Sequence, residues 1–377
     1  MFVIPKTMRA AVYRGVNDLR LETVPVPRIG ADELLVRVAV CGVCPTDIKK
    51  IQYATVTPPR IFGHETAGTI VRLGAQVRRF RVSDRVALHH HVPCLDCHYC
   101  RHRAFAQCPQ YKRTGITAGF EPAGGGFAEY VRVMASVLPG VVKIPPRVSF
   151  EEGAMLEPVN TVLKAVRRLS VLAGDVVLVA GQGPIGLIFT RLLQLEGARV
   201  IATDLLASRL RLAKKFGARW TFQVPGSPST RSGAVRPPED GTPHLQAGNA
   251  SFARLLSKLT RGRGLDAAVI TVPSDAVARE AQAALRGGGQ LLLFAHTRRG
   301  DNFAVDPAAV CVDEKDLLGS YSADFTLQGE VARLIFGRRL DVRPLLNNCF
   351  PLEQTADAIR LASNPTPRSL KVLVSPG

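Results

Sequence analysis

The sequence of 377 residues predicts an α/β protein with two domains, a β-rich domain and a doubly wound parallel sheet. Two observations lead to this prediction. Residues 1–150 consist of short apolar runs separated by turn residues, a pattern typical of β-rich domains. From about residue 161, compact apolar strands alternate with segments whose apolar residues recur at helical spacing, and this order favours a doubly wound parallel sheet.

The β-rich part predicts a series of short strands, at 8–15, 19–27, 32–44, 64–74, 83–91, 127–133 and 141–146. In the second part, strands are expected at 175–181, 199–204, 265–272, 289–295 and 316–322, and helices at 184–198, 208–218, 252–262 and 277–287. The tail predicts helices at 326–337 and 352–363 and a final strand at 370–375. A segment rich in Pro, Gly and Ser, 223–248, is expected to be an exposed, mobile insertion.

The composition is that of an ordinary globular protein, with 46% hydrophobic and 21% charged residues, and it argues against a disordered or fibrous chain. No apolar stretch approaches the length of a membrane span, and the first residues lack the apolar core of a signal peptide, so a cytoplasmic protein without a membrane partner is expected. The formal net charge is +18, but the basic residues are scattered and only 6% of residues are aromatic. This favours a solvated basic surface over nucleic-acid binding, and it would help to capture an anionic cofactor.

Six of the eight cysteines lie between positions 41 and 108, and such clusters are more often metal ligands than disulfides in a chain without a secretion signal. The motif C-x2-C-x2-C-x7-C predicts a closed zinc shell of four thiolates, formed by Cys94, Cys97, Cys100 and Cys108. Nearby histidines are expected to be exposed or to pack beside this shell rather than to bind the ion, namely His89, His90, His91, His98 and His102. Cys311 and Cys349 are expected to be small core residues.

A second group of candidate metal ligands is less distinctive. Cys44 lies twenty residues before His64, and Glu65 follows directly. Thiolate, imidazole and carboxylate groups suit an open zinc site, but many chains contain such a trio by chance. The spacing alone leaves both readings open.

A dinucleotide site is predicted at the run Gly181-Gln182-Gly183-Pro184-Ile185-Gly186, which has the form G-x-G-x-x-G between an apolar strand and a helix. Asp204 ends the next strand, 18 residues beyond Gly186, where its carboxylate would accept hydrogen bonds from the adenosine ribose and repel a 2′-phosphate. NAD is therefore expected to be preferred over NADP, although the nearby Arg209 would weaken this discrimination. The alternative is a glycine turn of any α/β protein, followed by a solvent-capped Asp.

Together with the nucleotide loop and the four-cysteine motif, three further runs resemble the zinc-dependent medium-chain dehydrogenase/reductase (alcohol dehydrogenase) family, namely CGVCPTD at 41–47, GHETAG at 63–68 and GGFAEY at 125–130. Leu156-Glu157-Pro158 resembles the sorbitol and threonine dehydrogenase branch, whereas classical alcohol dehydrogenases carry a cysteine ligand there. The resemblance implies a GroES-like β-barrel catalytic domain at 1–161 with its zinc lobe at 94–108. It also implies a Rossmann NAD-binding domain at 162–321 and a C-terminal segment, 322–377, that returns to the catalytic domain.

The resemblance also implies a role for each matching residue. Cys44 and His64 would be catalytic zinc ligands, and Glu65 and Glu157 would be carboxylates at the metal that bind it directly or through water. Asp47 would orient His64, and the Thr46 hydroxyl would take the proton of the alcohol. Cys41 does not match a ligand position and is expected to pack in the core.

The implied activity is reversible hydride transfer between a secondary alcohol, such as a polyol or amino alcohol, and NAD, with two Zn²⁺ ions per chain and zinc as a Lewis acid. Homo-oligomers, dimers or tetramers, are usual in the family. The alternatives are an NADP-dependent reductase of the same fold and, more remotely, a non-enzymatic zinc protein that binds nucleic acid.

Three features depart from the family pattern. Lys49 stands where a relay histidine is usual, and a lysine ordinarily stays protonated at neutral pH. Arg101-His102-Arg103 replaces the usual glycine after the third cysteine of the lobe. The 223–248 insertion is the third departure.

Overall fold

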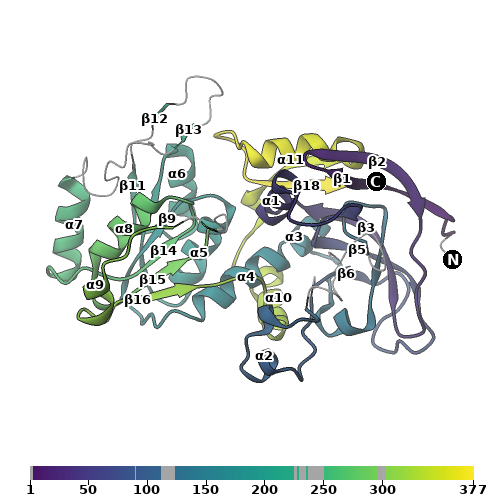
Figure 1. Cartoon of the computed structure of the whole chain (residues 1–377), viewed down its shortest axis with the longest axis horizontal. Coiled ribbons are helices and arrows are strands. Elements are labelled where there is room, and N and C mark those ends of the chain that lie inside the picture. Colours follow the sequence, from purple (N-terminus) through teal and green to yellow (C-terminus); the bar gives the residue numbers. More distant parts are fainter. Residues whose placement is uncertain are drawn as a thin grey trace. The chain divides into compact units, whose positions relative to one another are not determined.

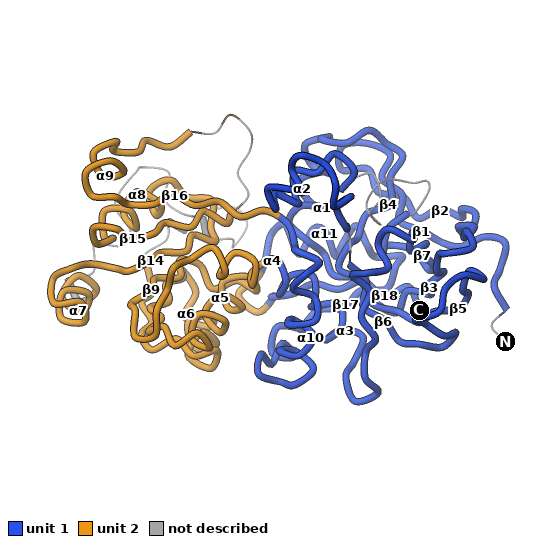
Figure 2. Tube along the Cα trace, turned by 90° about the horizontal axis from the view of Figure 1, so that it is seen from below, with its two compact units in different colours: residues 1–160, 322–365, 369–377 blue, residues 161–321, 366–368 orange. Residues whose placement is uncertain are grey.

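The computed structural model describes residues 3–89, 91–111, 124–224, 227–228, 235–236, 250–295, 300 and 302–377. The chain forms two compact units (Figure 2). Unit 1 comprises residues 1–160, 322–365 and 369–377, and unit 2 comprises residues 161–321 and 366–368. Each unit is built on sheets of its own.

Unit 1 contains a seven-stranded sheet in the order β17-β18-β3-β5-β6-β8, with β7 also paired to β3, and a three-stranded sheet in the order β2-β1-β4. Its strands are β1 (Thr7–Gly15), β2 (Asp18–Pro25), β3 (Leu34–Gly42), β4 (Arg60–Ile61), β5 (Glu65–Leu73), β6 (Arg85–Ala87), β7 (Tyr130–Val133), β8 (Val142–Lys143), β17 (Leu346–Pro351) and β18 (Lys371–Ser375). Its helices are α1 (Pro45–Tyr53), α2 (His98–Arg101), α3 (Phe150–Ala154), α10 (Gln328–Phe336) and α11 (Thr355–Ser363), and α4 (Leu156–Val166) begins in unit 1 and ends in unit 2 (Figure 1).

Strand β3 is buried on both faces, which explains its almost unbroken apolar sequence. Leu34, Val36 and Val38 belong to one apolar cluster, whereas Leu35 and Cys41 belong to another. The antiparallel register of β3 and β5 places the end of one strand opposite the start of the other. Residues that follow β3 and residues that precede β5 are therefore held close together.

Helix α1 is not among the elements expected from the sequence. Its start signal is a proline at the first helical position, Pro45, and its buried Ile48 and Ile51 are three residues apart on one face. The helix has only nine residues, so its apolar periodicity is too short to stand out from the neighbouring strands.

Unit 2 contains a six-stranded parallel sheet in the order β11-β10-β9-β14-β15-β16. Its strands are β9 (Val176–Ala180), β10 (Arg199–Asp204), β11 (Trp220–Gln223), β14 (Leu265–Ile270), β15 (Leu285–Leu293) and β16 (Asp316–Gly319). Its helices are α5 (Pro184–Leu195), α6 (Ala207–Lys215), α7 (Ala250–Thr260), α8 (Asp275–Ala284) and α9 (Pro307–Cys311) (Figure 1). Numbered by position in this unit, the strand order is 3-2-1-4-5-6, that of a doubly wound dinucleotide-binding sheet, so the predicted fold class is confirmed.

Most of the expected 223–248 insertion lies outside the described residues. Within it, β12 (Ser227–Pro228) and β13 (Val235–Arg236) pair antiparallel. Among the helices that the structure describes, none is both long and apolar enough to span a membrane.

One prediction about the core is wrong. Cys311 and Cys349 are exposed rather than buried. Cys311 ends the short helix α9, and Cys349 lies on the exposed face of β17, where partly buried and exposed residues alternate.

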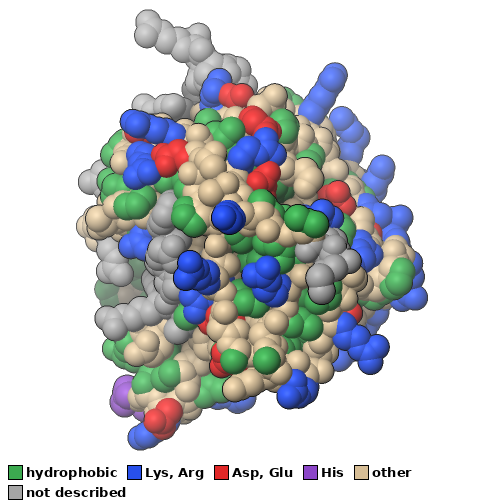
Figure 3. Space-filling model, turned by 90° about the vertical axis from the view of Figure 1, so that its right-hand side faces the viewer, with side chains coloured by type: hydrophobic (Ala, Val, Ile, Leu, Met, Phe, Trp, Pro, Cys, Tyr) green, Lys and Arg blue, Asp and Glu red, His purple; other side chains and the backbone are tan. Residues whose placement is uncertain are grey.

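Basic side chains are spread over the face shown in Figure 3, with acidic side chains between them. This is the distribution expected of a solvated basic surface.

Candidate functional site

The candidate metal ligands Cys44, His64 and Glu65 come together in unit 1. Cys44 follows β3 and precedes the first residue of α1, whereas His64 directly precedes β5 and Glu65 begins it. One potential ligand atom from each residue lies within 4.8 Å of the other two. The pairing of β3 with β5 thus brings Cys44 to His64, twenty residues further along the chain, and to Glu65 beside it.

The side chain of Asp47 lies behind His64. It is completely buried, and its Oδ1 is 3.2 Å from Nδ1 of His64. Burial would raise the pKa of Asp47, but the charge of His64 and a hydrogen bond from it outweigh burial and lower the pKa. Because Nδ1 faces this carboxylate, Nε2 is the nitrogen left for a metal ion.

The electrostatic environment of His64 favours a cation. Burial alone would lower the pKa of His64, but the charges of Asp47 and Cys44 raise it well above its ordinary value. The same negative surroundings would attract a divalent ion.

Glu65 forms a buried ion pair with Lys371, which begins β18. The ammonium also donates a hydrogen bond to the carbonyl oxygen of Val43, at 3.0 Å. Sequence reasoning missed Lys371, although a lysine within the otherwise apolar run LKVLVS is a recognisable signal of a buried charged partner.

Glu157 lies in the first turn of α4 and is also buried. It is not part of the three-residue cluster. Burial raises the pKa of Glu157 to about 7, against the opposing charge of His64. A carboxyl group with such a pKa can hold or release a proton near neutral pH.

The two remaining candidates in this region lie on α1. The Thr46 hydroxyl donates a hydrogen bond to Sγ of Cys44, at 3.2 Å. Thr46 and Lys49 are both half-buried. The hydroxyl of Thr46 is therefore at the proposed metal ligand itself.

The three donors fit zinc. Sulfur, imidazole nitrogen and carboxylate oxygen are ligands of catalytic zinc sites, and atoms bound to one ion at distances of about 2.0–2.3 Å lie at most about 4.6 Å apart. The three ligand atoms lie within 4.8 Å of one another, close enough for one ion to draw them together. Three protein donors leave a fourth position for a substrate.

The four cysteines of the lobe also come together. Sγ of Cys100 lies 3.9 Å from Sγ of Cys94 and 3.5 Å from Sγ of Cys97, and Sγ of Cys108 lies 3.6 Å from Sγ of Cys94. A tetrahedron with zinc–sulfur bonds of about 2.3 Å has edges of about 3.8 Å. The thiols therefore already stand at the spacing of a four-thiolate zinc shell.

Backbone groups prepare one of these thiols for metal binding. The N–H groups of Asp96 and Cys97 lower the pKa of the Cys94 thiol to about 6. A thiolate is the form that binds a metal ion. Burial, in contrast, raises the pKa of Cys100 to about 12, and this thiol would need the positive charge of the ion to lose its proton.

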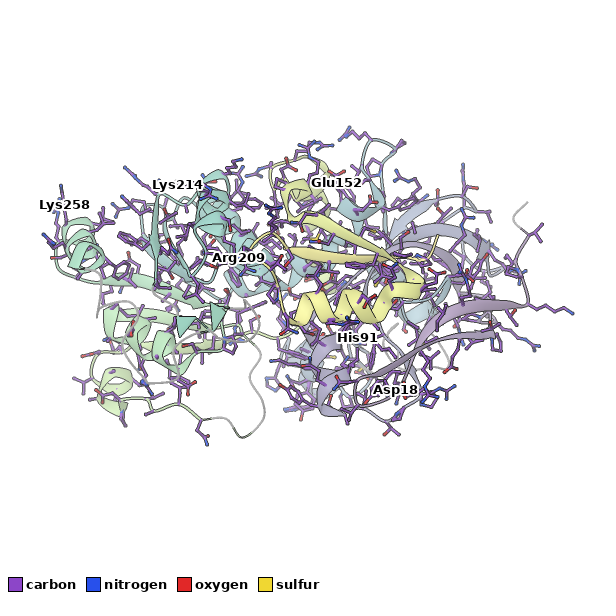
Figure 4. All side chains as sticks on the ribbon, turned by 90° about the horizontal axis from the view of Figure 1, so that it is seen from above. Asp18, His91, Glu152, Arg209, Lys214 and Lys258 are labelled. Carbon is purple, nitrogen blue, oxygen red and sulfur yellow. The ribbon has the colours of Figure 1, made fainter. Side chains whose placement is uncertain are left out.

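The histidines near the lobe fall into the two predicted groups or outside the described residues, except His89. His98 and His102 are exposed, His91 is buried against the lobe, His89 is buried elsewhere, and His90 lies outside the described residues. Burial lowers the pKa of His89 to about 4. His91, labelled in Figure 4, packs against Tyr111 with ring centroids 4.7 Å apart.

The predicted nucleotide loop of unit 2 lies between β9 and α5, with Gly183 before Pro184 and Ile185 in the first turn of the helix. Gly181 has φ +91°, and a Cβ atom on Gly186 would lie 1.8 Å from the carbonyl oxygen of Gly181, so both positions require glycine. Nothing lies within 4 Å of a Cβ built on Gly183. This open space at a helix N-terminus suits a pyrophosphate group.

Asp204 ends β10 beside this loop. Its Oδ2 accepts a hydrogen bond from the backbone N–H of Gln182 at 2.6 Å, and its Oδ1 accepts one from Leu206 at 2.8 Å. Each carboxylate oxygen retains a lone pair for a ribose hydroxyl. Nη1 of Arg209, which is labelled in Figure 4, lies 3.9 Å from Oδ2, and Nε of Arg209 has no hydrogen-bond partner among the described residues.

Comparison with known proteins agrees with this arrangement. The family model described as an alcohol dehydrogenase GroES-like domain matches residues 30–146, and the model described as a zinc-binding dehydrogenase matches residues 184–335. Sorbitol dehydrogenase of Gallus gallus is 31% identical over 359 residues, which cover 93% of this chain and 91% of that protein. Sorbitol dehydrogenase of Bacillus subtilis is 29% identical over 379 residues, which cover 99% of this chain and 98% of that protein.

A solved structure agrees as well. The crystal structure of a zinc-binding dehydrogenase from Sinorhizobium meliloti bound to NADP has a TM-score of 0.82 and 26% identity, with 99% of this chain and 100% of that chain covered. The chain belongs to the zinc-dependent medium-chain dehydrogenase/reductase family and is an alcohol dehydrogenase that resembles its sorbitol dehydrogenase branch.

Proposed function

We propose that this alcohol dehydrogenase transfers a hydride between a secondary alcohol, in particular a polyol, and NAD. The observation that carries this proposal is the set of Cys44, His64 and Glu65 within 4.8 Å of one another, with Glu157 buried nearby. The similarity of nearly the whole chain to sorbitol dehydrogenases supports a polyol as the substrate.

Each residue has a distinct task in this proposal. Cys44, Nε2 of His64 and Glu65 would hold a zinc ion, which, when bound, supplies Lewis-acid chemistry that lowers the pKa of an alcohol, while the nicotinamide accepts the hydride. Asp47 fixes the orientation of the His64 ring. The Thr46 hydroxyl would turn its proton away from Cys44 and donate it to an acceptor on the solvent side while it accepts the alcohol proton in its place.

We further propose two zinc ions per chain, one held by this trio and one by Cys94, Cys97, Cys100 and Cys108. Unit 1 would act as the catalytic domain and unit 2 as the nucleotide-binding domain, with the domain boundaries 1–161, 162–321 and 322–377 that the sequence predicts. The spacing of the four thiols and the glycine loop of unit 2 support this division.

A panel of secondary alcohols tests the proposed substrate class. Sorbitol, xylitol, a vicinal diol, an amino alcohol and a cyclic alcohol are each incubated with zinc-loaded protein and NAD, and formation of reduced cofactor is followed by absorbance. The enzyme should show its highest kcat/KM with a polyol. Turnover restricted to non-polyol alcohols, or no turnover at all, would refute the polyol assignment.

Asp204→Ala is expected to lower kcat/KM for NAD by about tenfold or more, because hydrogen bonds from the ribose to a charged carboxylate are lost. The value for NADP should fall less, since the mutation also removes repulsion of a 2′-phosphate. Asp175→Ala is the matched control, because Asp175 accepts a hydrogen bond from Leu172 before β9, at the opposite end of that strand from the glycine loop.

The alternative is use of NADP, which a phosphate contact with Arg209 would favour. Comparable kcat/KM values for NAD and NADP in the unaltered enzyme would overturn the proposed preference.

Thr46→Val is expected to lower kcat by about 10²-fold, because the hydroxyl that accepts the alcohol proton is lost. Lys49→Gln should retain most of kcat and raise KM at most, because protons leave through the ribose hydroxyl and water rather than through the lysine. Steady-state kinetics of both variants provide the measurement. A collapsed kcat in Lys49→Gln with normal cofactor binding would make this lysine the proton acceptor.

We also propose a homo-oligomer located in the cytoplasm. Strand β16 is an edge strand of the parallel sheet of unit 2. Val310 and Val312, shortly before it in the chain, are 37% and 80% exposed, and an edge strand with exposed apolar residues beside it suits pairing with a second copy. The free cysteines, including the clustered ones, suit a reducing compartment. Light scattering of the purified protein measures its oligomeric state.

A further inference from the structure

Lys371 brings a buried positive charge to the cluster of candidate ligands. Its side chain is 7% exposed and that of its partner Glu65 is 2% exposed. Strand β18 pairs with β3 so that Leu373 lies opposite Gly42, which directs the start of β18 toward the end of β3. The ammonium therefore contacts Glu65 and the carbonyl oxygen of Val43, the residue directly before Cys44.

The ion pair occupies a space that only glycine leaves open. A Cβ atom on Gly42 would lie 1.9 Å from Oε2 of Glu65 and 2.9 Å from Cε of Lys371. Both distances are shorter than real Cβ contacts. Glycine at position 42 therefore leaves room for this pair, and a larger residue would require the ends of the two side chains to move.

The charges around the site show what the lysine contributes. With zinc bound, the Cys44 thiolate and the carboxylates of Glu65 and Asp47 would carry three negative charges against the two positive charges of the ion, before Glu157 is counted. Lys371 supplies a third positive charge. Without Lys371, the summed negative charge of Cys44, Glu65 and Asp47 would exceed the positive charge of the zinc ion by one.

We propose that Lys371 is a positioning residue of the metal centre, which shares the Glu65 carboxylate with the zinc ion and thereby weakens the bond of this ligand to the metal. The inference rests on the proposed assignment of Cys44, His64 and Glu65 as ligands. Because a carboxylate that is paired with an ammonium donates less charge to the metal, the ion remains more electrophilic and is released more easily.

Release of zinc into a chromogenic chelator tests this role without alcohol or NAD. In Lys371→Met, zinc release from the site of Cys44, His64 and Glu65 should slow by at least about tenfold. The repulsion between the zinc ion and an ammonium group a few ångströms away, which this variant removes, corresponds to more than a factor of ten in the rate. Lys371→Arg keeps the charge and should release zinc at nearly the original rate. Lys315→Met is the matched control, because Lys315 is also buried beside an acid, Asp313 at 3.2 Å, but lies in unit 2.

A double-variant cycle shows whether the lysine acts through Glu65. Glu65→Gln removes the shared charge, so adding Lys371→Met to it should not slow release further. Cobalt(II) in the same site provides a spectroscopic readout, because its ligand-field bands report the kind and number of ligands. The positions and intensities of these bands should change in Lys371→Met and should match those of the unaltered protein in Lys371→Arg.

The opposite results would overturn the proposal. Unchanged or faster release from Lys371→Met, with the native circular dichroism spectrum retained, would show that the lysine does not compete for Glu65. If Lys371→Met fails to fold, Lys371→Gln keeps a donor for the Val43 carbonyl and should show the same slower release. If neither variant folds with zinc bound, the lysine supports the fold only and the proposal fails.

The release assay also separates this inference from the proposed function. A protein that shows the predicted release rates but does not oxidise polyols would contradict the substrate assignment alone. A polyol dehydrogenase whose zinc release ignores Lys371 would contradict the role of the lysine alone.

Discussion

Cys44→Ala is expected to abolish alcohol oxidation and to leave the fold largely intact. Cys44 supplies the thiolate of the proposed catalytic site, and the Thr46 hydroxyl loses its hydrogen-bond acceptor when the sulfur is removed. Loss of the Lewis acid removes several kcal/mol of transition-state stabilisation, so kcat/KM should fall by about 10³-fold or more.

The fold should survive because Cys44 makes no side-chain capping hydrogen bond to α1 and is only partly buried. Circular dichroism, thermal unfolding and steady-state kinetics are measured on the same preparation. Cys349→Ala, at an exposed cysteine of the same unit, is the control and should match the unaltered enzyme in all three. Retention of a tenth or more of the activity in Cys44→Ala would contradict the assignment.

Cys94→Ala is expected to have the largest effect on stability. Among the residues that the structure describes, the buried apolar cluster of the lobe consists of Cys100, Cys108 and Tyr111, with Cys97 and Phe105 packed against it. So small a cluster cannot hold a loop in place without the ion. The free energy of unfolding should fall by about 3–5 kcal/mol, because loss of a metal site is one of the few mechanisms that destabilise a protein by more than most substitutions do.

Calorimetry measures this change, together with the zinc content. Cys349→Ala, at an exposed cysteine outside the lobe, should unfold at the original temperature. An unchanged Tm for Cys94→Ala, with zinc content also unchanged, would show that the four thiols do not form a structural metal site.

The features that the sequence could predict depend on short, local patterns. The strand, glycine loop and helix around Gly181 and Gly186 are consecutive in the chain, and the parallel sheet follows from alternating strands and helices. The four cysteines of the lobe lie within fifteen residues, so their spacing alone suggested a common ion.

The features that the sequence could not predict depend on pairing between distant strands. Lys371 lies more than three hundred residues after Glu65, and only the pairing of β18 with β3 brings them together. The burial of His89 and the exposure of Cys349 likewise follow from which face of a sheet or loop the rest of the chain covers. Residue type is a weak guide to burial at such positions.

The same limit applies to Asp204. Its place at the end of β10 was predictable from the strand pattern, whereas its hydrogen bonds to Gln182 and Leu206 depend on how the loop closes over the strand. These bonds hold the carboxylate beside the glycine loop before any cofactor binds.

Zinc content and turnover, measured before and after mild chelation, show whether an open three-ligand site in unit 1 carries the activity. The purified protein should hold two zinc ions per chain at the start, because a closed four-thiolate shell and an open mixed site each hold one. Chelation should remove one ion together with the activity, and added zinc should restore both. Full activity in protein that retains only the chelator-resistant ion, or a fully metallated protein with a single zinc ion or none, would contradict this role of the site.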